Sequence, residues 1–243
     1  MRNSTSWRRI ATTLARTTLP CHCAICGMAS PDLVCPPCVT DYVKNTRRRC
    51  TACANPMDLA GSLCARCLAH TPSFDATIAA TDYAPPLDRL VLRLKFAAAL
   101  PLAGWFATML HEAIMADTSF IVPDLLCPVP LGDGRLTSRG FNQALEIARP
   151  LARTLGIALH PALALRVTET RAQSSVAPAG RARNVHNAFA LSPPAIWLVR
   201  GKHVGVVDDV MTSGHTLGEL AALFKRSGAA RVSNLVFART PPS

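Results

Sequence analysis

Aromatic residues and long apolar runs are both scarce in this chain of 243 residues. Phe, Trp and Tyr make up 5% of it, so it offers few rings on which nucleic-acid bases could stack. No uninterrupted apolar run reaches the roughly 20 residues that a membrane-spanning helix needs, which excludes a transmembrane protein. The apolar fraction of 49% is too high for a disordered protein, and the charged fraction of 17% is too low for a long coiled coil.

Lysine and acidic residues are scarce as well. Only four of the 26 basic residues are lysines, and there are 15 acidic residues, so the net charge of +11 is carried mainly by arginine. The planar guanidinium group suits phosphate and nucleic acid better than an ammonium group does. Three consecutive arginines at residues 47–49 are either a solvated linker or a contact to a phosphate backbone, and both interpretations stay open.

The first 20 residues lack the continuous apolar core and the small-residue cleavage site of a secretory signal peptide. Their Arg, Ser and Thr content is compatible with an organellar transit peptide. We interpret them instead as a basic, partly amphipathic helix, and we expect a cytoplasmic protein whose thiols stay reduced.

Nine of the ten cysteines lie within the first 67 residues, and eight of them form four successive Cys-x-x-Cys pairs. This spacing is typical of structural zinc sites, whereas a disulfide framework would need an oxidising compartment. The pairs can share two ions sequentially or in a cross-braced manner. In the sequential order, the predicted zinc ligands are Cys23, Cys26, Cys35 and Cys38 on one ion and Cys50, Cys53, Cys64 and Cys67 on the other. Cys21 and Cys127 are left over, and Cys127 is expected to be an inert core residue.

Apolar runs and helical periodicities alternate after residue 70. We expect strands at residues 78–80, 124–130, 196–199, 204–207 and 232–237, and helices at residues 87–94, 102–115, 141–155 and 217–227. This alternation predicts an α/β domain with a mainly parallel sheet flanked by helices. The chain is thus divided into a basic segment at residues 1–20, a cysteine module at residues 21–70 and an α/β domain at residues 71–243.

The most informative segment is VGVVDDVMTSGHTLGE, residues 204–219. An apolar strand is expected to end at Asp208 and Asp209, and a loop of small and hydroxylic residues then leads into a helix. Backbone N–H groups at a helix start bind anions, and two adjacent acids suit the hydroxyls of a sugar or a magnesium ion. The segment therefore predicts a ribose 5-phosphate site, formed by Asp208, Asp209, Thr212, Ser213, Gly214, His215 and Thr216. The alternative is an ordinary capped helix beside solvated acids.

The stretch VVDDVMTSGHT resembles the phosphoribosyl pyrophosphate motif of type I phosphoribosyltransferases. From Cys23 onward the chain resembles the ComF family of bacterial competence proteins, which has ComFC-like and GntX-like members and an N-terminal double zinc ribbon. The matching segments are the Cys-x-x-Cys module, Tyr83, LVLRLKF at residues 90–96, Pro128-Val129-Pro130, residues 139–143, Thr170, Gln173, Arg181, Arg183, Asn184 and Phe189. The resemblance implies a type I phosphoribosyltransferase-like sheet, with Asp208 and Asp209 holding ribose hydroxyls or magnesium.

The resemblance also implies that residues 212–216 surround the 5-phosphate and that a pyrophosphate loop follows Pro130. Arg139, Asn142 and Gln143 are candidates for contacting the pyrophosphate, because several negative charges require guanidinium partners. The alternative is that these three residues order their own loop through hydrogen bonds. His215 stands where the family often has a small residue, and we assign it no acid–base role.

Three functions remain open. The first is a DNA-uptake protein that acts on single-stranded DNA in natural transformation and binds phosphoribosyl pyrophosphate or a related ribose phosphate. The second is an active phosphoribosyltransferase, a glycosyltransferase of nucleotide or base metabolism that uses magnesium. The third is a GntX-like metabolic adaptor, in which the zinc module docks a protein partner such as another competence protein.

Overall fold

The computed structural model describes residues 22–44, 47–58, 61–167, 188–193 and 195–241. The chain forms two compact units, Met1–Asn45 and Thr46–Ser243. The basic helix expected at residues 1–20 lies outside the described residues, as do Cys21 and the motif residues expected between 170 and 184. Among the described helices, none has both the length and the apolar character needed to cross a membrane.

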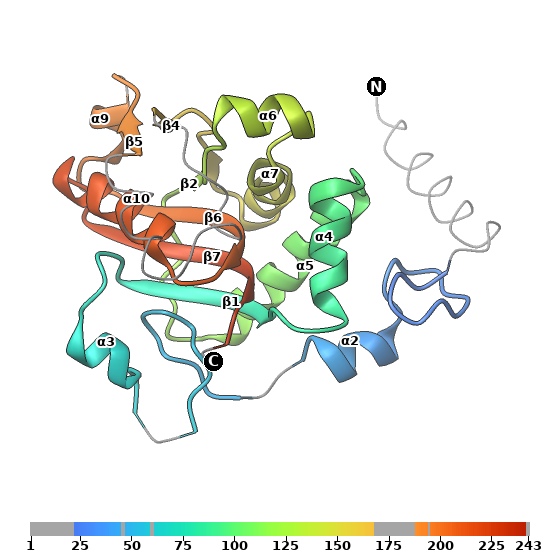
Figure 1. The fold of residues 1–243 in the computed structure, drawn as a ribbon. Helices are drawn as coiled ribbons and strands as arrows, with labels where there is room; N and C mark the ends of the chain where they lie inside the picture. The colour runs from blue at the N-terminus through green and yellow to red at the C-terminus, as the bar shows by residue number, and fades with distance from the viewer. Residues whose placement is uncertain (1–21, 45–46, 59–60, 168–187, 194, 242–243) are drawn as a thin grey trace, which may run out of the picture. The chain divides into compact units, whose positions relative to one another are not determined.

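The described part of the first unit contains a turn that carries Cys23 and Cys26 and the short helix α2 (Pro36–Tyr42), which Cys35 precedes and which contains Cys38 (Figure 1). Proline stands at the start of α2, where the missing N–H group would have no partner within the helix. The backbone N–H of Cys23 donates to the carbonyl of Met28 at 2.8 Å, which closes the turn of Cys23 and Cys26. Apart from its cysteines the described part of this unit buries few side chains, mainly Val34 and Val43, so a bound metal would supply most of its stability.

A five-stranded sheet with the order β1-β7-β6-β2-β3 is the centre of the second unit (Figure 1). Its strands are β1 (Ala76–Asp82), β2 (Leu125–Pro128), β3 (Ala158–Leu159), β6 (His203–Met211) and β7 (Arg231–Arg239). All four pairings are parallel. The central strands are apolar and buried on both faces, as parallel strands are when helices cover both sides of a sheet. The predicted mainly parallel sheet is confirmed.

Helices cover both faces of this sheet. They are α4 (Leu87–Phe96), α5 (Pro101–Ala116), α7 (Gln143–Leu155) and α10 (His215–Arg226). α5 packs against α7, β1 and β7, and α7 also contacts β2, whereas α10 packs against β6 and β7. The chain moves across the sheet in opposite directions at the α7 and α10 crossovers, and right-handed crossovers then place these helices on opposite faces.

Smaller elements complete the second unit. They are α3 (Ala65–Ala69), α6 (Asp133–Arg139), α9 (Ala195–Val199) and an antiparallel pair of β4 (Ala164–Arg166) and β5 (Phe189–Leu191). The strand predicted at residues 196–199 is wrong, because this segment is α9, whose Trp197 is 77% exposed. A run of four apolar residues does not distinguish a buried strand from a short helix. The two prolines before it favour the first turn of a helix.

Several element boundaries differ from expectation by a few residues, and two of these differences bear on the site. α7 begins at Gln143 rather than at residue 141, because the side chain of Asn142 caps it, and it ends at the left-handed Gly156 as expected. The strand expected at residues 204–207 continues through Asp208 and Asp209 to Met211, where it remains paired with β7. The two acids therefore lie within the strand rather than after it, so their side chains alternate between its faces.

Candidate functional site

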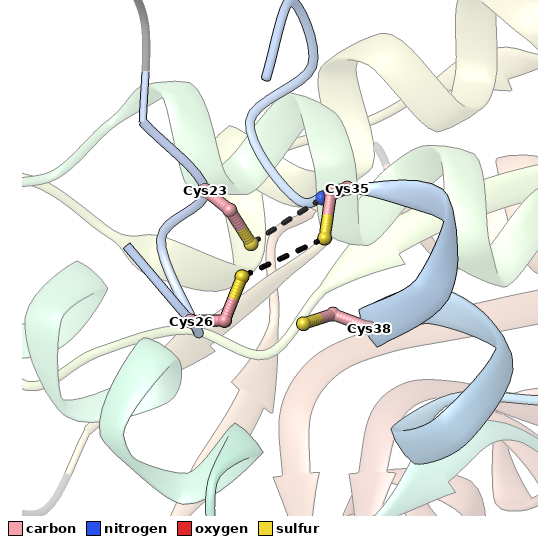
Figure 2. Close-up of side chains that lie close together, drawn as sticks. All are labelled: Cys23, Cys26, Cys35 and Cys38. Atoms are coloured by element: carbon pink, nitrogen blue, oxygen red, sulfur yellow. Dashed lines mark hydrogen bonds between the residues drawn. The ribbon is translucent and has the colours of Figure 1, made fainter. Parts of the chain in front are cut away.

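Two clusters of four cysteines have the geometry of tetrahedral metal sites. The sulfur atoms of the first cysteine cluster (Cys23, Cys26, Cys35 and Cys38, Figure 2) all lie within 4.8 Å of one another, and so do those of the second cysteine cluster (Cys50, Cys53, Cys64 and Cys67). Single S···S distances are 3.7 Å in the first and 3.6 Å in the second. Ligands about 2.3 Å from a zinc ion are about 3.8 Å apart in a tetrahedron, whereas a disulfide measures about 2.05 Å. The described cysteines are thus grouped sequentially and are not disulfide-bonded.

The electrostatics of both clusters favour a cation. The backbone N–H of Cys35 donates to the Cys23 sulfur at 3.4 Å, and the N–H of Cys64 donates to the Cys50 sulfur at 3.3 Å. Burial by itself raises the pKa of the Cys23 thiol, but backbone N–H groups outweigh it and lower that pKa to about 6. Burial also raises the pKa of Cys64, but the backbone N–H of Cys67 and hydrogen bonds with the other three thiols of the cluster outweigh it and lower that pKa to about 7. Each cluster therefore contains a thiol ready to ionise, and both clusters could hold zinc.

Cys127 lies apart from both clusters, in the middle of β2. It is 0% exposed, and burial raises the pKa of its thiol to about 12. This confirms the prediction of an inert core cysteine.

The second cysteine cluster is attached to the parallel sheet. The N–H of Thr77 in β1 donates to the carbonyl of Thr51 at 3.1 Å, and its hydroxyl donates to the carbonyl of Ala52 at 2.6 Å. Arg49 pairs with Asp82 at the end of β1, at 2.8 Å. Of the three consecutive arginines, Arg49 therefore has a structural partner. The division of the chain at residue 70 stays a prediction, and these contacts place the second cluster in one compact unit with the sheet.

Residues 212–214 connect β6 to α10, and His215 and Thr216 form the start of α10, so the predicted anion-binding segment 212–216 (the 212–216 loop below) spans the turn and the beginning of the helix. Gly214 is left-handed with φ +83° and caps α10. The left-handed backbone favours glycine here, and a Cβ at this position would lie 2.6 Å from the side-chain Cε of Met211, so the flexible end of that side chain would have to move. The Nδ1 of His215 lies 3.1 Å from the Ser213 hydroxyl, which gives His215 a local partner within the loop.

Asp208 and Asp209 have different surroundings, although we expected both to face a ligand. The Asp209 residue is 3% exposed, and its carboxylate lies 2.8 Å from the Nζ of Lys95 on α4. Asp208 is partly exposed. Burial and the adjacent charge of Asp209 raise the pKa of Asp208 well above its usual value. Asp208 is thus the more exposed residue of the two, although burial of its carboxyl is the main cause of its raised pKa, and Asp209 is held by a lysine that the sequence pattern did not mark as a site residue.

The three residues expected to contact pyrophosphate have partners within the protein: Arg139 pairs with Gln143, and Asn142 contacts the backbone. The Asn142 side chain accepts from the N–H of Ala144 at 2.9 Å and donates to the carbonyl of Val129 at 3.0 Å. Arg139 donates to the side-chain oxygen of Gln143. Asn142 therefore orders its own loop, as the alternative interpretation expected. Contact of Arg139, Asn142 and Gln143 with a ligand stays a prediction.

Arg139 also lies over the ring of Phe96, with its guanidinium carbon 5.4 Å from the ring centroid. Phe96 follows Lys95 at the end of α4. The LVLRLKF segment therefore brings a cation and an aromatic ring to the same edge of the sheet as Asp208 and Asp209. The sequence resemblance marked residues 90–96 as a matching segment. It did not predict that Lys95 would pair with Asp209 or that Phe96 would lie under Arg139.

Arg239, the last residue of β7, is a further residue that sequence reasoning missed. It is 3% exposed, and its Nε donates to the carbonyl of Cys53 at 2.9 Å. Its Nη1 donates to the carbonyl of Met211 at 3.0 Å and also to those of Thr212 and Thr240. One guanidinium group thus joins the second cysteine cluster to the start of the 212–216 loop.

Arg66 makes a second connection of the same kind. It lies between the cluster residues Cys64 and Cys67, and its Nη2 donates to the carbonyl of Ser213 at 2.7 Å.

A cavity of about 290 Å³ lies beside this contact, and it is not lined by Asp208 or Asp209. Its polar lining includes Arg66, His70, Ser213, His215 and Glu219.

Sequence comparison finds relatives along nearly the whole chain. Residues 142–242 match the model of the phosphoribosyl transferase domain. The DNA utilization protein YhgH of Salmonella typhi is 36% identical over 229 residues, 92% of this chain and 99% of the relative. YhgH of Escherichia coli K12 is 32% identical over 221 residues, 90% of each chain. Competence protein F of Haemophilus influenzae Rd is 30% identical over 186 residues, 75% of this chain and 81% of the relative.

Solved structures similar to the α/β domain are phosphoribosyltransferases and related enzymes. The purine phosphoribosyltransferase of Pyrococcus horikoshii is 18% identical, with 58% of this chain and 72% of that chain covered and a TM-score of 0.29. The glutamine phosphoribosylpyrophosphate amidotransferase of B. subtilis is 19% identical, with 55% and 25% covered and a TM-score of 0.35. By the matched domain and the strand order, the α/β domain is phosphoribosyltransferase-like in fold.

Proposed function

Because the chain belongs to the ComF family, with the DNA utilization protein YhgH and competence protein F, we propose that it binds phosphoribosyl pyrophosphate or a related ribose phosphate. The observation that carries this proposal is the 212–216 loop. Its left-handed Gly214 caps a 12-residue helix, and the loop begins at the end of the strand that contains Asp208 and Asp209. Such a turn suits a phosphate, and an adjacent carboxylate suits the sugar that bears it.

The 5-phosphate would be bound by the backbone N–H groups of the loop and by the hydroxyls of Thr212, Ser213 and Thr216. Asp208 would accept hydrogen bonds from the ribose hydroxyls or coordinate magnesium, since carboxylate oxygen is the ligand that this ion prefers. When bound, magnesium would supply charge stabilisation to the pyrophosphate. The positive charge would also favour the ionised form of Asp208, whose pKa burial and Asp209 raise.

Lys95 and Arg139 are two described cations that interact with Asp208 and Asp209. The charges of Asp208 and Asp209 raise the pKa of Arg139, although burial has the larger and opposite effect. Burial likewise lowers the pKa of Lys95, but here the two carboxylates outweigh it and raise that pKa. Both cations stay charged near neutral pH, so they can offset the negative charge of a pyrophosphate group.

Calorimetry with phosphoribosyl pyrophosphate and magnesium tests the site. We expect wild-type protein to bind and Asp208→Asn to lose at least about tenfold in affinity, the scale of one charge-assisted hydrogen bond to a ligand. Asp88→Asn, which removes an exposed carboxylate at the start of α4, is the matched control and should bind as the wild type does. Equal affinities of Asp208→Asn and wild type would refute the placement. Product formation with a panel of bases and amines then separates a transferase from a binding protein.

A second function, handling of single-stranded DNA, is favoured by the names of the relatives and by the net charge of +11. Arginines that neutralise phosphates release counterions, so the affinity should fall steeply with salt. Binding of a labelled oligonucleotide is measured between low and physiological salt. A negative slope of log affinity against log salt supports the function, and a lack of binding at low salt refutes it. Few aromatic residues are present to add stacking, so we expect modest affinity.

A further inference from the structure

The carbonyl groups of residues 211–213 all accept hydrogen bonds from two arginines of the same region. Arg239 donates to the first two, and Arg66 donates to the third. In a planar trans peptide the C=O group and the following N–H group point in opposite directions. The N–H groups of residues 212–214 are therefore directed away from the two guanidinium groups. This is the arrangement of a backbone anion site, in which successive N–H groups face one side.

Both arginines are connected to the second cysteine cluster. Arg239 is held at its other end by the carbonyl of Cys53, which is a residue of the cluster. Arg66 lies between Cys64 and Cys67, within the turn that these two cysteines would close on a metal. Metal ligation orders such turns, which have little apolar surface of their own. Loss of the metal would release Arg66 and remove one fixed partner of Arg239.

We propose that the second cysteine cluster holds the 212–216 loop in its anion-binding conformation through the positioning residues Arg239 and Arg66. Ligand affinity at the loop therefore depends on the metal of this cluster. The first cysteine cluster belongs to the other compact unit, and its metal is not needed for the loop. The identity of the ligand in this inference rests on the proposed function. The dependence of the loop conformation on the two arginines does not.

Amide hydrogen exchange of residues 211–216 in the full-length, zinc-loaded protein tests the arginine connection without any ligand. Arg66→Ala removes one hydrogen bond of about 1 kcal/mol, so exchange in the loop should rise roughly fivefold. Arg66→Lys restores a donor and should return exchange toward the wild-type rate, which a merely structural effect of truncation would not do. Arg48→Ala, an exposed arginine of the same module, is the matched control and should change nothing in the loop. Wild-type exchange in Arg66→Ala would overturn the proposal, as would an equal rise throughout β6 and β7.

The metal connection is tested by comparing two double variants. Cys23→Ser/Cys26→Ser and Cys53→Ser/Cys64→Ser should each lose one bound zinc, and only the second should speed exchange at residues 211–216 and weaken binding of phosphoribosyl pyrophosphate. Equal loop exchange in both double variants would refute the dependence on the second cluster. Failure of the wild-type protein to bind phosphoribosyl pyrophosphate would refute the proposed function, and the exchange measurements would still decide this inference. Since the Arg66 variants keep every zinc ligand, they decide it even if a cysteine variant does not fold.

Discussion

The Nζ of Lys95 lies 2.8 Å from the carboxylate of Asp209, and the Asp209 side chain is 4% exposed. Lys95 stands near the end of α4 and Asp209 lies within β6, so this ion pair joins the helix to the central strand of the sheet. Burial of a carboxylate is costly unless a cation compensates it. The pair therefore explains how two acids can be adjacent at this position in the folded protein.

Lys95→Met should destabilise the fold strongly, because it leaves Asp209 buried without its cation. Breaking a buried pair in this way costs about 3–5 kcal/mol, and we expect a loss near the lower value because Lys95 is itself partly exposed. Urea unfolding measures the change in free energy.

Lys225→Met is the matched control for that variant, since Lys225 pairs with Asp75 at 2.7 Å in a more exposed setting. A pair of this kind contributes at most about 1 kcal/mol. If both lysine variants lose the same free energy of unfolding, the Lys95–Asp209 pair stabilises the fold no more than an exposed ion pair does.

Gly214→Ala should abolish ribose-phosphate binding while the protein still folds. The left-handed backbone costs a non-glycine residue about 1–2 kcal/mol, and the new Cβ would meet the side chain of Met211 at 2.6 Å. Calorimetry with phosphoribosyl pyrophosphate measures the loss of affinity, and thermal unfolding measures the cost to the fold.

Gly218→Ala, one turn further along α10, is its control. No atom lies within 4 Å of a Cβ at this position, and alanine is the better helix former by about 1 kcal/mol. This variant should bind like the wild type and unfold at a slightly higher temperature. Unchanged affinity in Gly214→Ala would mean that the loop does not hold the phosphate.

Wild-type protein should contain two zinc ions per chain, and Cys53→Ser should contain one. Four sulfurs of each cluster lie within 4.8 Å of one another, and removal of one ligand disrupts a closed tetrahedral site. Metal analysis of the purified protein by mass spectrometry gives the count. Cys127→Ala should retain both ions, because Cys127 lies in the core of β2 and belongs to neither cluster. A count of two zinc ions in Cys53→Ser would contradict the assignment of this ligand.

His203 should make the fold less stable as the pH falls below about 6.5. Burial, with the charge of Arg231 adding to it, lowers the pKa of His203 to about 4 from its ordinary 6.5. Between these two values the unfolded chain binds a proton at this position and the folded protein does not, so stability is complete above the ordinary pKa and decreases toward the lower one. His203→Gln should reduce the slope of unfolding free energy against pH between about pH 6.5 and 4.

The partner of the His203 ring is the Ser233 hydroxyl at 2.8 Å, which glutamine can also bond, so the variant is expected to fold. An identical pH dependence in His203→Gln and wild type would show that this residue is not responsible.

Local patterns were sufficient for most elements and for the chemistry of the cysteines. The four Cys-x-x-Cys pairs predicted two sites of four cysteines each, because each pair lies on one tight turn whose geometry two intervening residues set. The apolar runs at residues 204–207 and 232–237 predicted β6 and β7, although not their full length. The run at residues 196–199 was misread as a strand, since four apolar residues carry no periodicity.

The order of residues along this chain was enough to indicate a parallel α/β sheet, two metal-binding clusters and an anion-binding loop after two acids. The partners of those acids and of that loop depended on the folded molecule. Arg66 and Ser213 are 147 residues apart, and Arg239 and Cys53 are 186 apart. Spacing and periodicity in a sequence predict only contacts within one helix, strand or turn. The burial of Asp209 against Lys95 and the hydrogen bonds from Arg66 and Arg239 to the loop form only when distant segments pack around one sheet.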